Sequence, residues 1–261
     1  MSGNKFGILL ARQRSGTGAL GSILDRHRQL HYLGEILHPG NLGQEKNFFT
    51  YLSQVLEEDK EAFLPKNRLH VLDKFVDTMR EDGVTPILDV KYSSIHHLYG
   101  DWQSPLSRPQ ILNHAEGRVV PIIHLTRKNH AKTFVSGRLA ETNAVWHTND
   151  KSAAQIRSIE INPAQLLRFI RNSVRESKLV QKWLAGHPRV VTFDYSDMLD
   201  PQGRLTDTIC EKLSTTLGIE SFVEKQPSFV KQAPDSLKES IKNYDEVADH
   251  LSDTSFRWML K

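Results

Sequence analysis

Four short runs rich in hydrophobic residues along the chain are predicted to form strands. They cover residues 6–11, 86–91, 119–126 and 189–193. The runs do not alternate between hydrophobic and polar positions, and this is typical of strands buried on both faces of a parallel sheet. Parallel strands need long crossover connections, and the intervals between the runs are long enough to supply them.

Helical periodicity fills much of the space between these runs. Hydrophobic residues recur at intervals of three and four in the segments 17–27, 44–57, 67–80, 162–185, 205–217 and 236–251. Asn67 stands at an N-cap position with Gly83 beyond the end of its segment, and Asn162-Pro163 is a typical helix start. Strands that alternate with helices predict an α/β protein, a three-layer sandwich with a central, mostly parallel sheet and right-handed crossovers.

Composition narrows the class of protein. The 261 residues are 38% hydrophobic and 25% charged, and they contain no repeat or low-complexity linker, so one domain over residues 1–261 is expected. A net charge of +3 gives no bulk argument for a nucleic-acid or membrane partner. Cys210 is the only cysteine, which excludes an intramolecular disulfide. No hydrophobic run approaches 18 residues and no signal peptide is evident, so a cytoplasmic location is expected.

The segment that follows the first predicted strand has the composition of an anion-binding loop. In a strand-loop-helix, successive backbone N–H groups of the loop and of the first helical turn point toward one spot. Here the loop adds two arginines, two hydroxyl side chains and two glycines that permit close approach of a ligand. These residues are Arg12, Arg14, Ser15, Gly16, Thr17 and Gly18. The loop is predicted to bind a phosphate-like group.

The glycine spacing discriminates between kinds of loop. No lysine follows a glycine as in the nucleotide triphosphatase pattern GxxxxGK[ST]. Gly16, Gly18 and Gly21 nearly spell the dinucleotide fingerprint GxGxxG, for which Glu35 would be the acidic partner. A basic residue followed by Ser-Gly-Thr resembles instead the 5′-phosphosulfate loop of sulfotransferases. An ordinary tight turn does not require two arginines and two hydroxyls.

A second candidate anion site follows the predicted strand at 119–126. Arg127 stands at the strand exit, where open α/β sheets bind ligands, and Ser136 comes nine residues later on a helix. A guanidinium can bind a phosphate through two hydrogen bonds and the serine adds a third donor. The pair resembles the 3′-phosphate motif of sulfotransferases. Together with the loop, this resemblance implies one ligand, 3′-phosphoadenosine 5′-phosphosulfate, with 3′,5′-bisphosphoadenosine as the product.

Residues 6–41 resemble the bacterial carbohydrate sulfotransferases of the trehalose and nodulation-factor type. Those proteins have a strand led by an aromatic residue, a basic residue with S/T-G-T, and a Gly-Glu dipeptide after the first helix, here Gly34-Glu35. In that group the glutamate is the general base, so the resemblance assigns this role to Glu35. The alternative is that Glu35 caps a turn or pairs with Arg12 or Arg28.

Other parts of the chain carry weaker features. Cytosolic sulfotransferases use a histidine base placed after a strand, so His96 and His97 are the alternatives to Glu35. Residues 241–246 resemble the C-terminal I-x-N-x-x-E pattern of many sulfotransferases, and the segment 220–261 is expected to cover the nucleotide site. Lys231 is a candidate contact of the 3′-phosphate or the adenine, or else a solvated lysine. Lys91, at the end of a predicted strand, is either an ion-pair partner or an acceptor-site residue.

The resemblance implies a sulfotransferase that acts on a hydroxyl, and the expected acceptor is a carbohydrate or a glycolipid. Arg14 would neutralise charge on the oxygen that bridges sulfur and phosphorus, and no metal is required. A homodimer is expected from related bacterial enzymes, and a nucleic-acid partner is not. The alternatives are a P-loop-like nucleotide kinase, a catalytically silent nucleotide-binding protein of the same fold and, last, a nicotinamide oxidoreductase.

Overall fold

The chain divides into two compact units in the computed structural model. The structure describes residues 6–99, 104, 106–143, 156–228 and 236–261. The first unit comprises Met1–Thr126 and Trp183–Gln226, and the second comprises Arg127–Lys182 and Pro227–Lys261. The expectation of one domain over residues 1–261 stays a prediction.

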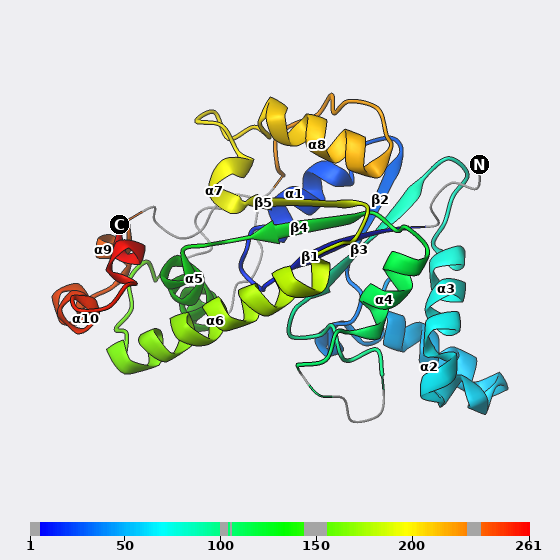
Figure 1. Cartoon of the computed structure of the whole chain (residues 1–261), viewed down its shortest axis with the longest axis horizontal. Coiled ribbons are helices and arrows are strands. Elements are labelled where there is room, and N and C mark those ends of the chain that lie inside the picture. The colour runs from blue at the N-terminus through cyan, green and yellow to red at the C-terminus, as the bar shows by residue number, and fades with distance from the viewer. Residues whose placement is uncertain (1–5, 100–103, 105, 144–155, 229–235) are drawn as a thin grey trace. The chain divides into compact units, whose positions relative to one another are not determined.

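A five-stranded sheet forms the centre of the first unit as far as the structure describes it (Figure 1). Its strands are β1 (Gly7–Ala11), β2 (Leu30–Glu35), β3 (Thr85–Lys91), β4 (Ile122–Thr126) and β5 (Val190–Asp194). They follow the order β2-β3-β1-β4-β5, and every neighbouring pair is parallel. The predicted α/β class with a parallel central sheet is therefore confirmed, and four of the five strands lie where the hydrophobic runs predicted them.

Helices cover both faces of this sheet. They are α1 (Thr17–Leu24), α2 (Phe48–Glu58), α3 (Arg68–Thr78), α4 (Gln110–Gly117), α7 (Tyr195–Met198) and α8 (Asp207–Leu217). Short 3₁₀ helices lie at Pro39–Asn41, Lys60–Phe63 and Pro65–Asn67. Helices α1 and α8 lie on one face, and α3 and α4 lie on the other (Figure 1).

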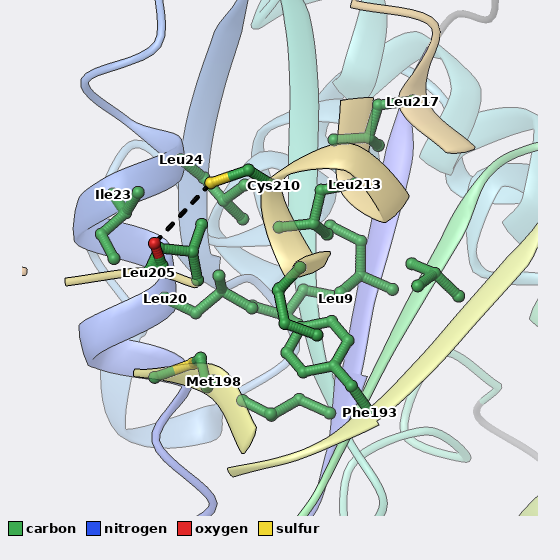
Figure 2. Packing of buried hydrophobic residues seen from close by; sticks show 14 of the residues in the cluster. Leu9, Leu20, Ile23, Leu24, Phe193, Met198, Leu205, Cys210, Leu213 and Leu217 are labelled. Carbon is green, nitrogen blue, oxygen red and sulfur yellow. Dashed lines mark hydrogen bonds between the residues drawn. The ribbon is translucent and has the colours of Figure 1, made fainter. Parts of the chain in front are cut away.

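The face under α1 and α8 contains the main described core. Leu20 and Leu24 of α1 and Leu213 of α8 are buried against strand residues, among them Leu9 and Phe193 (Figure 2). Leu9 lies on the central strand, so the residues that end this strand are held by packing on the helix that follows it. Burial of each such side chain contributes about 1.5–3 kcal/mol, which fixes the β1–α1 connection.

The second unit is helical. It contains α5 (His130–Asn143), α6 (Pro163–Leu184, whose last two residues belong to the first unit), α9 (Leu237–Ser240) and α10 (Tyr244–Leu251), followed by a 3₁₀ helix at Arg257–Leu260. Hydrophobic side chains from these helices form its own buried cluster, including Val135, Ile170 and Val247. This cluster buries the apolar faces of α5, α6 and α10.

The structure corrects one predicted helix and shows how another begins. The segment 236–251 is not one helix, because Ile159 pairs with the backbone on both sides of Ile241 and interrupts it: Ile159 N–H donates to Ser240 O, and Lys242 N–H donates to Ile159 O. Asn67 is the N-cap residue of α3, as predicted, but its side chain makes no cap hydrogen bond; its amide donates instead to the carbonyl of Glu61 at 2.9 Å.

Candidate anion site at the carboxyl edge of the sheet

The predicted anion loop, residues 12–16, joins the central strand β1 to α1. Gly16 is the N-cap residue of α1 and has a φ of 92°, and no side chain of the described residues caps the helix. Arg14 also has a positive φ, of 62°. A Cβ atom on Gly16 would lie 2.3 Å from Cδ2 of Tyr195, so this position accepts only glycine without a shift of the ring. The first N–H groups of α1 are thus left to a ligand rather than to a capping side chain.

Both hydroxyl residues of the loop are buried. Ser15 is 1% exposed and Thr17 is 6% exposed. The Thr17 hydroxyl oxygen accepts a hydrogen bond from Lys91 Nζ at 2.5 Å. A hydroxyl has one proton and two lone pairs, so a hydroxyl that accepts from an ammonium group keeps its proton for a bond to an anion. The contact therefore favours Thr17 as a donor to a ligand at the start of α1.

Lys91 belongs to a buried charged cluster at the end of β3. Its Nζ lies 2.6 and 2.7 Å from the two carboxylate oxygens of Asp89, and both side chains are almost fully buried. The Tyr32 hydroxyl donates to the same carboxylate at 2.5 Å, and burial raises the pKa of this phenol well above its usual value. A buried ion is tolerated when it is paired and hydrogen-bonded in this way. Of the two roles expected for Lys91, the structure shows the ion-pair partner.

Glu35, the predicted base, lies at the same edge of the sheet. It ends β2, and its Oε1 lies 3.5 Å from Lys91 Nζ, with about a quarter of the side chain exposed (26%). Strand β2 was not predicted; the segment was interpreted as the connection after the first helix. Arg28, one predicted partner of Glu35, pairs instead with Glu220.

A β-bulge sets the direction of Glu35. Tyr32 pairs with Ile87 and Glu35 pairs with Asp89, so three steps along β2 match two steps along β3. One extra residue in a strand reverses the alternation of its side chains. Gly34, with a φ of 74°, lies in this bulge and supplies the left-handed backbone that it needs. The bulge places the Glu35 side chain toward Lys91.

Arg14 is close enough to Glu35 for the two charges to interact. Burial lowers the pKa of the Arg14 guanidinium, and the negative charge of Glu35 opposes this change. Burial also lowers the pKa of Arg12, where Tyr92 has the opposing effect. The loop therefore holds two partly desolvated arginines, whose attraction for an anion exceeds that of fully hydrated ones.

A second buried network supports the loop from beside Lys91. The Tyr92 N–H donates to the carbonyl of Ala11, and its hydroxyl lies 2.5 Å from His124 Nε2. His124 Nδ1 lies 3.2 Å from the Thr192 hydroxyl. Burial lowers the pKa of His124 to about 4, and a neutral imidazole satisfies both neighbours by accepting at one nitrogen and donating at the other. No local sequence pattern identifies this network, because Tyr92, His124 and Thr192 lie on or after three different strands.

The two histidines proposed as alternatives to Glu35 lie in the turn after β3. The ring of His96 packs edge-on against Trp183 with 6.1 Å between ring centroids. His97 is exposed. The choice of general base between these residues and Glu35 stays a prediction.

The residues predicted to bind a 3′-phosphate fall in the second unit. Arg127 directly follows the last residue of β4, and Ser136 is buried on α5, as the sequence pattern predicted. Lys231 lies outside the described residues. That these three residues contact a 3′-phosphate stays a prediction, as does the expectation that residues 220–261 cover the nucleotide.

Two searches of the described residues give negative results. No three His, Cys, Asp or Glu side chains among them are grouped as metal ligands would be. None of their helices combines the length and the hydrophobicity that crossing a membrane requires.

The fold and the site define an α/β protein with a candidate anion site at the carboxyl edge of its parallel sheet. No protein-family model matches the chain, and no curated protein matches it. It is similar to the crystal structure of a sulfotransferase from Alicyclobacillus acidocaldarius, with a TM-score of 0.47 and 12% identity over 100% of this chain and 96% of that one. It is also similar to the sulfotransferase domain from the curacin biosynthetic pathway, with a TM-score of 0.47 and 15% identity over 84% of this chain and 75% of that one. These likenesses are distant, and the function proposed below is argued from the residues of this chain.

Proposed function

We propose that the protein transfers a sulfuryl group from 3′-phosphoadenosine 5′-phosphosulfate to a hydroxyl of a carbohydrate or glycolipid. One observation carries the proposal: Glu35 and Lys91 lie together at the edge of the sheet where Thr17 begins the uncapped helix α1. The combination joins an anion-binding helix start to a carboxylate that can accept a proton. The resemblance of the loop to a 5′-phosphosulfate loop supports a 5′-phosphosulfate as the anion that it binds.

The donor is held by the β1–α1 loop in this proposal. Backbone N–H groups of residues 15–18 and the hydroxyls of Ser15 and Thr17 donate to the 5′-phosphosulfate, and Arg12 and Arg14 supply positive charge. Lys91 holds the Thr17 hydroxyl by donating to it. Donors fixed before the reaction need no reorganisation when charge develops, which makes them the largest catalytic contribution in many enzymes.

The transfer step follows from these positions. The acceptor oxygen attacks sulfur and forms a new S–O bond, and its proton passes to the carboxylate of Glu35. The bond between sulfur and the bridging oxygen breaks, its electron pair stays on that oxygen, and 3′,5′-bisphosphoadenosine leaves. Arg14 stabilises the charge that grows on the bridging oxygen. Lys91, 3.5 Å from Glu35, keeps the carboxylate in place.

The 3′-phosphate is assigned to Arg127 and Ser136, with Lys231 as a further contact. This assignment is supported by the sequence pattern, an arginine after a strand and a serine nine residues later on a helix. A guanidinium and a hydroxyl together offer three donors to the phosphate oxygens.

A sulfuryl-transfer assay tests the proposal. The protein is incubated with the donor and with trehalose or chitooligosaccharides, and mass spectrometry follows the gain of one SO₃. Replacement of the base, Glu35→Gln, is expected to lower kcat about 10²–10⁴-fold without weakening 3′,5′-bisphosphoadenosine binding. Arg14→Ala is expected to lower kcat about 10²–10³-fold and also to weaken that binding. Glu45→Gln, which changes an exposed glutamate, is the matched control and keeps the wild-type rate.

Two outcomes contradict parts of the proposal. Near wild-type turnover of Glu35→Gln, with loss of turnover in His96→Gln or His97→Gln, assigns the base to a histidine. Stabilisation by magnesium-ATP but not by 3′,5′-bisphosphoadenosine, without transfer of SO₃ to any acceptor, indicates a nucleotide kinase in place of a sulfotransferase.

A further inference from the structure

Helix α6 carries a line of five positive charges. Arg168, Arg171, Arg175, Lys178 and Lys182 follow one another at intervals of three, four, three and four residues. At about 100° per residue these positions lie within an arc of about 80°, and at about 1.5 Å per residue the line is about 21 Å long. All five residues are exposed, and all belong to the second unit. We call these five residues the basic stripe.

The charges of the basic stripe are not compensated by the part of the chain that the structure describes. None of its five residues forms an ion pair or side-chain hydrogen bond with the described residues. Like charges three or four positions apart destabilise a helix, and the stripe contains four such neighbouring pairs. Glu176 is the only acidic residue of α6. The stripe therefore weakens the helix that carries it, and a polyanion bound along it would remove the repulsion.

The stripe lies opposite the face that holds α6 in place. Leu166 and Ile170 are buried in the hydrophobic cluster of the second unit, and Ser173 is buried on the same side. At about 100° per residue, the centre of this buried face lies about 150° around the helix from the centre of the basic stripe. The helix is thus fixed by its apolar side, and the five cations are presented on a rigid support.

The chemistry of the stripe discriminates between polyanions. Three of its five cations are arginines, whose planar fork matches sulfate and carboxylate groups. No large hydrophobic residue of α6 is exposed, so the stripe offers neither an aromatic platform for stacked bases nor an apolar side chain for insertion into lipid. The cations form a single line, and this suits a linear chain of regularly spaced anions.

We propose that the basic stripe binds a linear acidic carbohydrate, a glycan chain that carries sulfate or carboxylate groups. The choice of a carbohydrate among linear polyanions rests on the proposed function, because sulfuryl transfer to a glycan produces such a chain. The stripe is a binding surface in its own right, and its residues take no part in the transfer step.

Direct binding to two model glycans tests the stripe. The full chain is titrated with dextran sulfate and with polygalacturonate at low and at raised salt. The triple variant Arg168→Gln, Arg171→Gln, Arg175→Gln is expected to bind both glycans at least about tenfold more weakly at low salt. Each of the three ion pairs between an arginine and a glycan anion contributes a modest binding free energy, and the three are lost together. The wild-type affinity is expected to fall as salt is raised.

A matched triple variant separates the stripe from net charge. Lys46→Gln, Lys74→Gln and Lys212→Gln also remove three positive charges, but from exposed lysines of the first unit. This variant is expected to bind both glycans within about twofold of wild type. Equal weakening of the two triple variants overturns the proposal, because the effect would then follow net charge alone.

Titrations with other polyanions identify which kind of ligand the basic stripe binds. Tighter binding of duplex DNA or of phosphatidylserine vesicles than of either glycan, at the same salt, overturns the assignment to a carbohydrate. The addition of 3′,5′-bisphosphoadenosine separates this proposal from the transfer activity. If glycan binding depends on the stripe but the nucleotide does not stabilise the protein, the stripe proposal is supported and the proposed function is contradicted. If the nucleotide stabilises the protein but glycan binding does not depend on the stripe, the proposed function is supported and the stripe proposal is contradicted.

Discussion

Gly16 and Gly43 have almost the same φ angle in very different surroundings. Their φ angles are 92° and 93°, but a Cβ would meet Tyr195 at 2.3 Å in the first case and nothing within 4 Å in the second. Gly43→Ala is expected to cost about 1 kcal/mol of unfolding free energy, the cost of left-handed backbone with a side chain. Gly16→Ala is expected to cost more, because the Tyr195 ring must also move. Urea denaturation of the two variants measures the difference.

The Tyr195 ring itself provides the control for this prediction. In a Gly16→Ala background, Tyr195→Ala removes the atoms that the new Cβ would meet, so the second substitution is expected to cost less there than in the wild-type chain. Equal losses for Gly16→Ala and Gly43→Ala would mean that Tyr195 does not confine the loop.

The loop was predictable at the residue level and the charged cluster beside it was not. Ser15, Gly16 and Thr17 are contiguous, so their spacing alone shows the chemistry of the loop. Asp89 and Lys91 lie in a run of residues whose pattern predicts only a strand that ends at Lys91. Their contacts with Tyr32, Thr17 and Glu35 depend on which strand lies beside β3, and no local pattern contains that information.

Strand β2 was missed because the signal that identifies a strand is weak in it. Its six residues, Leu-His-Tyr-Leu-Gly-Glu, are neither a continuous hydrophobic run nor a clean alternation, and only its two leucines are buried. The bulge at Gly34 also breaks the period of two on which strand prediction depends. The long hydrophobic runs of β1, β3 and β4 carry no such interruption, and they were predicted.

His124 connects three elements of the sheet, and this gives the protein a pH-dependent stability. It lies on β4 and contacts Tyr92 after β3 and Thr192 on β5. Burial lowers its pKa to about 4, below the value of about 6.5 in the unfolded chain, so the unfolded chain takes up the proton first as the pH falls. The contribution of this residue is complete above about pH 6.5, decreases by about 3 kcal/mol toward pH 4, and changes no further below that.

His124→Gln tests this contribution. A glutamine can accept from Tyr92 and donate to Thr192 but does not titrate. Urea denaturation at pH 7.5 and at pH 4.5 is expected to show a smaller loss of unfolding free energy for the variant than for wild type. Parallel losses in the two proteins would show that His124 is not the group responsible.

The distribution of charge over the molecule matters more than its sum. A net charge of +3 gave no reason to expect a polyanionic partner. Yet α6 alone carries five cations on one exposed line, and acidic residues elsewhere in the chain balance them in the total. The sequence alone shows that these five residues fall on one side of a helix. Only the structure shows that they have no ion-pair partner among the residues it describes.

Two separate parts of the chain are proposed to bind the two ends of the nucleotide, and a pair of ligands tests this assignment. Arg14 is proposed to bind the 5′ end and Arg127 the 3′-phosphate, so 3′,5′-bisphosphoadenosine is expected to stabilise the protein more than AMP, which lacks the 3′-phosphate. At about 100 times its dissociation constant a ligand adds about 2.7 kcal/mol to the free energy of unfolding, a rise in Tm of several degrees for a chain of this size.

Arg127→Ala is expected to reduce the difference in stabilisation between the bisphosphate and AMP. Arg138→Ala, which changes an exposed arginine on α5, is the control and leaves this difference unchanged. Equal stabilisation by the two nucleotides would remove Arg127 and Ser136 from the site while leaving the loop at residues 12–18 as the place where the 5′ end binds.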